Sequence, residues 1–131
     1  MAELKAGIKG MAETEATKDN TAAAVGSGIL QVFATPMMIA LMEKASCDSV
    51  APYLEEGAGT VGTKVDITHD AATPVGMKVR AEAELVEVDG RRLVFKVEAF
   101  DESGRIGGGM HERFIVYNEK FQTKTDAKLK K

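Results

Sequence analysis

Apolar and polar side chains alternate along the second half of the chain. Over 77–88 and again over 92–100, nearly every second residue is apolar and the residues between them are mostly charged. The pair Asp89–Gly90 between these segments is a strong signal for a tight hairpin turn. Patterns of the same period predict further strands over 60–68 and 105–117. These segments together predict an antiparallel β-sheet.

A different period appears over 36–50, where the pattern predicts a helix. Thr35 suits the N-cap and Pro36 the first helical position, where its missing N–H costs nothing, and Pro52 discourages continuation. A helix that is apolar on all sides is buried on most of them, so the sheet has to wrap around it. The apolar side chains that cover this helix are Met37, Met38, Ile39, Ala40, Leu41, Met42 and Ala45.

The remaining segments complete an α+β plan. One strand is expected within 4–17, and 20–28 is expected to be a loop because it is made of small residues and two glycines. Five lysines follow residue 119, and the tail from about 121 is expected to be a solvated, flexible end. The 131 residues contain no repeat or linker, so 1–131 is expected to form a single domain.

Composition removes several classes of function. A net charge of −3 offers no basic surface for the phosphates of nucleic acid. One cysteine allows no internal disulfide and favours a reducing compartment. The first residues lack the apolar core of a signal peptide, and no apolar run approaches the length of a membrane span. A cytoplasmic protein without a membrane or nucleic-acid partner is therefore expected.

A histidine interrupts the apolar positions of the 60–68 strand. Period two places Val61, Thr63, Val65, Ile67 and His69 on one face, the face that is expected to be buried. A lone histidine on such a face is more often a hydrogen-bonded core residue than a catalyst, so this position alone does not decide between the two roles.

Two residues of the predicted helix could accompany this histidine. Thr35 and Glu43 are eight residues apart, about two turns and about 12 Å along a helix axis. A hydroxyl, a carboxylate and the imidazole of His69 meeting at one end of the helix would suit hydrolysis of an activated acyl group. From spacing alone the signal is weak, because an N-cap explains Thr35 and solvent exposure explains Glu43.

The last strand carries a second group of polar residues. His111 and Arg113 share one face of it, and the planar fork of Arg113 suits a phosphate or a carboxylate. A structural ion pair is an equally good explanation of this arginine. His69 and His111 could in principle bind zinc, but no ligand pair has the spacing of a zinc motif, so no metal is expected.

Four segments together resemble the fluoroacetyl-CoA thioesterase-like family of hot-dog-fold proteins. They are VFATPMMIALMEKA, VGTKVDITHDAATPVGM, EVDGRRL and GGGMHERF, which occur in the family's order and at matching spacings. The resemblance implies a hot-dog fold, in which a long central helix is wrapped by an antiparallel sheet. It also implies a homodimer that forms by joining two sheets.

The resemblance further implies an acyl-CoA thioesterase, which hydrolyses a CoA thioester to a carboxylic acid and free CoA. CoA enters as part of the substrate, and no separate cofactor is implied. A phenylalanine that gates the site of the fluoroacetyl-specific members falls, by spacing, on Ile29. The family's catalytic Thr–Glu–His set falls on Thr35, Glu43 and His69, and its substrate contacts fall on Gly62 and Arg113.

Three other functions stay open at this point. A non-catalytic acyl-CoA-binding protein would use the same fold without turnover. A hot-dog hydratase or dehydratase usually pairs an acid with a histidine at a close spacing, which is absent here. A purely structural dimer would have to explain Glu43 in an apolar helix, because a buried carboxylate needs water or a partner.

Overall fold

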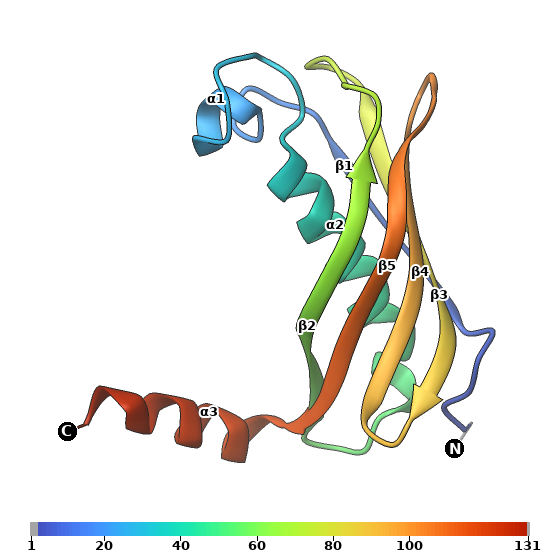
Figure 1. Ribbon diagram of the computed structural model, residues 1–131, viewed down its shortest axis with the longest axis vertical. Helices are drawn as coiled ribbons and strands as arrows, with labels where there is room; N and C mark the ends of the chain where they lie inside the picture. Colours follow the sequence, from blue (N-terminus) through green and yellow to red (C-terminus); the bar gives the residue numbers. More distant parts are fainter. Residues whose placement is uncertain (1–2, 131) are drawn as a thin grey trace.

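The computed structural model describes residues 3–130, and its centre is one antiparallel sheet of five strands in the order β1-β3-β4-β5-β2. Helix α2 lies along one face of this sheet, while α1 and α3 lie near its two ends (Figure 1). The strands are β1 (Lys9–Glu15), β2 (Ala58–His69), β3 (Lys78–Asp89), β4 (Arg92–Asp101) and β5 (Gly104–Tyr117). The helices are α1 (Ala22–Val25), α2 (Thr35–Val50), α3 (Asn118–Asp126) and the short 3₁₀ turns η1 (Ala51–Tyr53) and η2 (Ala127–Leu129).

The predicted strands and their hairpins are confirmed. The pairing of β3 with β4 extends as far as Asp89 and Arg92, and Gly90 takes the positive φ of 62° that this tight turn requires. At the next turn the Asp101 carboxylate accepts hydrogen bonds from two backbone N–H groups that follow it. Both turns depend on neighbouring residues only, which is why the sequence pattern was sufficient to predict them.

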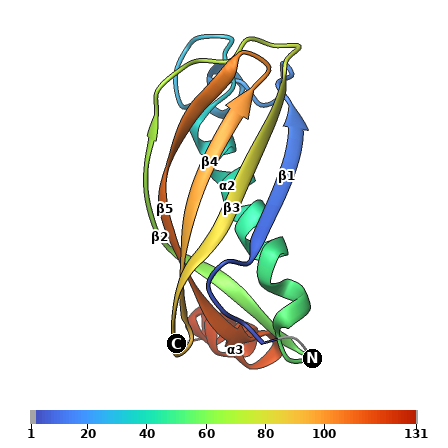
Figure 2. The ribbon, with the colours of Figure 1, turned by 90° about the vertical axis from the view of Figure 1, so that its right-hand side faces the viewer.

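Helix α2 packs on the sheet mainly through β1 and β3, as Figure 2 shows from the sheet side. Gly10 allows the close approach, because a Cβ there would lie 2.5 Å from the backbone oxygen of Ala45. The helix side chains in the core are Met38, Leu41, Met42 and Ala45. Burying a leucine or methionine contributes roughly 1.5–3 kcal/mol, so this face holds the helix in place.

The sheet covers only one side of α2, although the sequence predicted that it wraps the whole helix. Ala40, Lys44 and Asp48 are exposed along the opposite side, and Ile39 is half-buried. Figure 1 shows this side of the helix without a covering element between α1 and α3. Among residues 3–130, no helix or strand is packed over this side of α2.

The prediction that Thr35 caps α2 is wrong. Ala34 is the N-cap residue, no side chain caps the helix, and Thr35 is its first residue with Pro36 following. The hydroxyl of Thr35 is instead engaged by a tertiary contact described below. The segment 20–28, predicted as a loop, contains the single helical turn α1, whose N-cap hydroxyl comes from Thr21.

A β-bulge changes which residues of β2 share a face. The register with β5 shifts between Gly62 and Lys64, so Thr63 is an extra residue without an opposite partner. Val65 and His69 face the same side as expected, but the prediction that Val61 and Thr63 share that face is wrong. An inserted residue reverses the alternation beyond it, and the side-chain pattern does not reveal the insertion.

The segment predicted as a flexible tail is helical. α3 leaves the sheet at the end of β5 and projects away from it, and all of its residues are exposed (Figure 1). Its mobility stays a prediction. Across residues 3–130 no helix combines the length and the apolar character needed to cross a membrane.

Candidate active site

Thr35 and His69 meet where the start of α2 lies beside the end of β2. The Thr35 hydroxyl and Nδ1 of His69 share a hydrogen bond of 2.6 Å. They line a pocket of about 210 Å³ together with Phe33 and residues 70–72. A hydroxyl bonded to an imidazole can lose its proton to that ring, so the pair has the chemistry of a proton relay.

The imidazole of His69 is partly withdrawn from solvent. Burial lowers its pKa, and the backbone at Ala71 and the charge of Asp70 offset only part of this effect. The ring is therefore neutral at pH 7 and can accept a proton through Nδ1. Its other nitrogen, Nε2, is buried and has no hydrogen-bond partner within residues 3–130, an arrangement that costs about 1–3 kcal/mol in a folded protein.

Backbone and side-chain bonds from one loop hold both residues in place. The Thr73 carbonyl accepts a hydrogen bond of 2.9 Å from the N–H of Phe33, two residues before Thr35. The Thr73 hydroxyl donates to the buried Asp101 carboxylate at 2.7 Å. The loop that follows His69 is thus tied both to the start of α2 and to the β4–β5 turn, which preorganises the pair.

Glu43 belongs to a second cluster, further along α2. Its Oε2 lies 3.8 Å from Nη1 of Arg113, a β5 residue whose side chain is only 8% exposed, whereas the Glu43 side chain is 40% exposed. Gly62 of β2 completes the cluster, since a Cβ on it would stand 2.7 Å from the same carboxylate oxygen. The absence of a side chain at Gly62 therefore leaves the space that the carboxylate occupies.

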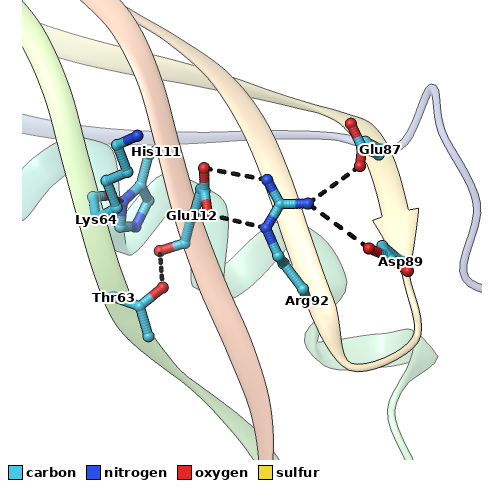
Figure 3. Close-up of polar contacts among 7 residues, drawn as sticks. All are labelled: Thr63, Lys64, Glu87, Asp89, Arg92, His111 and Glu112. Atoms are coloured by element: carbon cyan, nitrogen blue, oxygen red, sulfur yellow. Dashed lines mark hydrogen bonds and ion pairs between the residues drawn. The ribbon is translucent and has the colours of Figure 1, made fainter.

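Gly62 and His69 both face the helix side of the sheet only because β2 contains the bulge. Gly62 and His69 are seven residues apart, so a regular strand would place them on opposite faces. The extra residue Thr63 restores a common face, and its hydroxyl donates to the backbone carbonyl of Glu112 at 3.2 Å. Figure 3 shows this contact next to His111 and Lys64.

His111 is the residue of this region whose role sequence reasoning missed. It contacts Arg113 and is 1% exposed, whereas the sequence indicated for it only a possible role as a zinc ligand. The signal available was its place two residues before Arg113, which puts both on one face of a strand. No group of three or more His, Cys, Asp or Glu within the described part of the chain is arranged to hold a metal.

The outer face of the sheet carries ion pairs that serve the fold. Arg92 donates two hydrogen bonds to the Glu112 carboxylate, at 3.0 and 3.2 Å, and also contacts Glu87 and Asp89 (Figure 3). The same pairing lowers the pKa of Glu112. This network fastens β5 to the β3–β4 hairpin on the side opposite to α2, and it supplies no group to either cluster.

The structure therefore brings the predicted site residues together as two groups. Thr35 and His69 form one, and Glu43, Gly62 and Arg113 form the other. Thr35 and Glu43 begin about 12 Å apart along the helix axis, and no hydrogen bond joins Glu43 to Thr35 or His69 among residues 3–130.

Comparison with known proteins gives this geometry a context. The family model described as fluoroacetyl-CoA-specific thioesterase matches residues 16–119. A fluoroacetyl-CoA thioesterase from Streptantibioticus cattleyicolor is 49% identical over 98 residues, which cover 75% of this chain and 70% of that protein. The chain belongs to the fluoroacetyl-CoA-specific thioesterase family. It is accordingly a thioester hydrolase, as the sequence resemblance implied.

Solved structures agree with this family assignment. A fluoroacetyl-CoA thioesterase superposes with a TM-score of 0.91 at 38% identity, over 97% of this chain and 98% of that one. A variant of a fluoroacetyl-CoA-specific thioesterase in complex with fluoroacetate and CoA gives a TM-score of 0.84 at 39% identity, over 90% and 99% of the two chains. A hot-dog-like protein from Thermanaerovibrio acidaminovorans, 20% identical, shares the fold alone, with a TM-score of 0.85 over 95% and 93% of the chains. The predicted hot-dog fold is confirmed.

Proposed function

We propose that this protein hydrolyses an acyl-CoA thioester to a carboxylic acid and free CoA, with Thr35, Glu43 and His69 as its reactive groups. The observation that carries the proposal is the 2.6 Å bond between the Thr35 hydroxyl and His69, because that contact replaces a helix cap that the hydroxyl could otherwise have made. The position of the Glu43 carboxylate in a sparsely polar stretch of α2, next to a buried guanidinium, supports the third member.

In the proposed reaction Glu43 either activates a water molecule or attacks the thioester carbonyl itself. If Glu43 activates water, a proton of that water passes through the Thr35 hydroxyl to Nδ1 of His69 and from there to the departing CoA thiolate. If Glu43 attacks the carbonyl, CoA leaves as the thiolate and an anhydride forms. Water then hydrolyses the anhydride, and the proton of that water follows the same path to the thiolate. A backbone N–H at Gly62 is the proposed donor to the developing oxyanion, where one such donor typically contributes about 3 kcal/mol. The free donor capacity of Arg113 would contact the acyl end or part of CoA.

The separation of the two clusters leads to a specific form of homodimer. Two sheets that join through the edge strand β2 would bring the open sides of two α2 helices together, antiparallel about a two-fold axis. An axis near Ile39 would set Thr35 of one protomer beside Glu43 of the partner subunit, because both residues are four positions from that point. The dimer would thus unite groups that one protomer holds apart.

Mixing two inactive variants tests this arrangement. We expect Glu43→Gln and His69→Ala each to abolish thiol release from acyl-CoA while remaining folded dimers. After the two are unfolded and refolded together, half of the dimers should be mixed and one of their two sites intact, giving about a quarter of wild-type activity. Zero activity would place the whole site within one protomer, and undiminished turnover by both single variants would refute the proposed function.

The segment before α2 bears on the acyl group. Ile29 occupies the gate position by spacing and is 90% exposed, close to α1 and the start of α2. Isoleucine lacks the large aromatic face that a phenylalanine offers to a bound group. We therefore propose a preference broader than fluoroacetyl-CoA, and a panel of acyl-CoAs of increasing chain length, scored by thiol release, would reveal it.

The alternative is a protein that binds acyl-CoA without turnover. It would be favoured if the purified protein bound CoA esters at equilibrium but released no thiol across that panel. A single cysteine makes the reducing interior of the cell the proposed location for either function.

A further inference from the structure

The buried imidazole of His111 has a defined set of partners that the proposed mechanism does not use. Its Nδ1 lies 2.8 Å from the backbone carbonyl oxygen of Lys64, and its Nε2 lies 3.2 Å from Nη1 of Arg113. A carbonyl can only accept and a guanidinium can only donate. The ring is therefore neutral with its proton on Nδ1, donates to Lys64 and accepts from Arg113.

Arg113 depends on this acceptor for its position. Its Nε donates to the Thr60 hydroxyl at 2.8 Å, and its Nη2 donates to the Thr60 carbonyl at 3.0 Å. His111 accepts from the remaining arm of the fork, the same nitrogen that lies 3.8 Å from Glu43. Contacts in three directions leave the guanidinium no freedom to turn, so its charge stays directed at the Glu43 carboxylate.

The other partner of His111 belongs to the bulge of β2, which turns Gly62 and His69 to the same face of the sheet. Lys64 directly follows the extra residue Thr63, and the His111 imidazole bonds the Lys64 carbonyl. Bulges leave part of the ladder unpaired, and here a side chain from β5 bonds the backbone carbonyl directly after the extra residue. The same ring thus touches both the bulge and the guanidinium.

We propose that His111 is a positioning residue, which links the bulge of β2 to the Arg113 guanidinium and so holds Gly62 and Arg113 around the Glu43 carboxylate. The inference rests on the proposed function, in which Glu43 takes part in turnover. It predicts that the acceptor at Nε2 matters more for the rate of the reaction than for the affinity of the substrate, because the nitrogen of Arg113 that it holds is the one nearest Glu43.

Acid should disturb this arrangement. A proton on Nε2 would set an N–H against the N–H of Arg113 and turn an acceptor into a donor. Burial is the main reason that the pKa of His111 is lowered, and the charge of Arg113 lowers it further, while Glu43 from α2 and Glu112 from β5 act in the opposite sense. The neutral ring is therefore the working form at pH 7.

Substitutions at position 111 separate positioning from folding. His111→Gln can keep an amide oxygen near Nε2 for Arg113, whereas His111→Met has a similar volume and no acceptor. We expect His111→Met to lower kcat about 10- to 100-fold with KM changed less than about threefold, and His111→Gln to retain most of the turnover. Val50→Ala, a core change at the far end of α2, is the control for lost stability alone.

The outcomes distinguish the possible failures. If His111→Met turns over at the wild-type rate while Glu43→Gln is inactive, the positioning role is wrong and the proposed function stands. If Glu43→Gln is fully active, the catalytic role of Glu43 in the proposed function is wrong, and the positioning role of His111 falls with it. If Val50→Ala, at equal loss of stability, lowers kcat as much as His111→Met, the role of His111 is only structural.

A second variant covers the case in which His111→Met does not fold. Thr60→Val removes the hydroxyl acceptor of Arg113 Nε at nearly constant shape, and Thr60→Ser restores it. We expect Thr60→Val to lower kcat with little change in KM and Thr60→Ser to recover most of the loss. A wild-type kcat in both Thr60→Val and Thr60→Ser would overturn the idea that the Arg113 guanidinium must be fixed for Glu43 to act.

Discussion

A single methyl group at position 62 should test whether the Glu43 carboxylate must stay where the structure places it. Gly62 has no positive φ, so alanine can adopt its backbone conformation. The new Cβ would lie 2.7 Å from Oε2 of Glu43, where ordinary van der Waals contact begins at about 3.4 Å. The carboxylate oxygen must therefore move by the difference between these values, about 0.7 Å.

This displacement should affect catalysis far more than stability. The Glu43 side chain is partly exposed and flexible, so it can move away at small cost. Gly→Ala at a compatible backbone position contributes about 0.4–1 kcal/mol through the unfolded chain, which offsets part of the strain. A misplacement approaching 1 Å at a reacting group can lower the rate about 100-fold, so we expect Gly62→Ala to lower kcat by about 10- to 100-fold.

The assay is steady-state thiol release from an acyl-CoA, together with urea unfolding of each variant. Gly59→Ala is the matched control, because it lies in the same strand and its Cβ would meet a flexible side chain, the Asn118 amide oxygen at 2.5 Å. We expect that control to keep kcat within about twofold. A wild-type kcat in Gly62→Ala would show that the rate does not depend on the position of the Glu43 carboxylate, and the catalytic role proposed for Glu43 would be wrong.

Three further outcomes follow from the contacts around the first cluster. Thr35→Val should lower kcat at least about 100-fold because the relay to His69 is lost, whereas Thr35→Ser should keep much of the wild-type kcat. Equal kcat values for the two variants in stopped-time thiol assays would contradict the relay. Thr73→Val should cost about 1–3 kcal/mol in urea unfolding, because Asp101 loses a buried donor, while Thr73→Ser should cost much less; similar losses in both would mean that the hydroxyl is not the cause. Burial lowers the pKa of both His69 and His111 below 6.5, so the unfolded chain binds more protons and stability present above pH 6.5 is lost as pH falls through the folded-state values. Urea unfolding between pH 7.5 and 5 should show this slope reduced in His69→Gln, and an unchanged slope would exclude a contribution from that ring.

Much of the fold could be predicted because its determinants are local. The alternation over β3 and β4, the Asp89–Gly90 turn and the Pro36 start of α2 each involve residues within a few positions of one another. Such patterns constrain the chain whatever surrounds it, and they were sufficient to predict the strands and the long helix. The family segments extended this prediction to the hot-dog fold, which the comparisons confirm.

The arrangement of the site is different, because it depends on pairings between distant segments. Nothing near Thr35 in the sequence indicates that its hydroxyl bonds His69 instead of capping α2, since that choice follows from the loop held by Thr73. Nothing near Glu43 indicates that it faces Arg113, a residue 70 positions away in the sequence. These contacts exist only once β2, β5 and α2 have packed together.

The bulge at Thr63 shows most clearly which features the sequence determines and which depend on tertiary packing. The sequence by itself determined that β2 is a strand, that His69 lies at its end and that the helix beside it is apolar. Only the pairing of β2 with β5 decided that one residue is left over, which turns Gly62 and His69 to the same face. Side-chain alternation has a period of two, so a single unpaired residue reverses every position beyond it, and that residue is identified only by its partner strand.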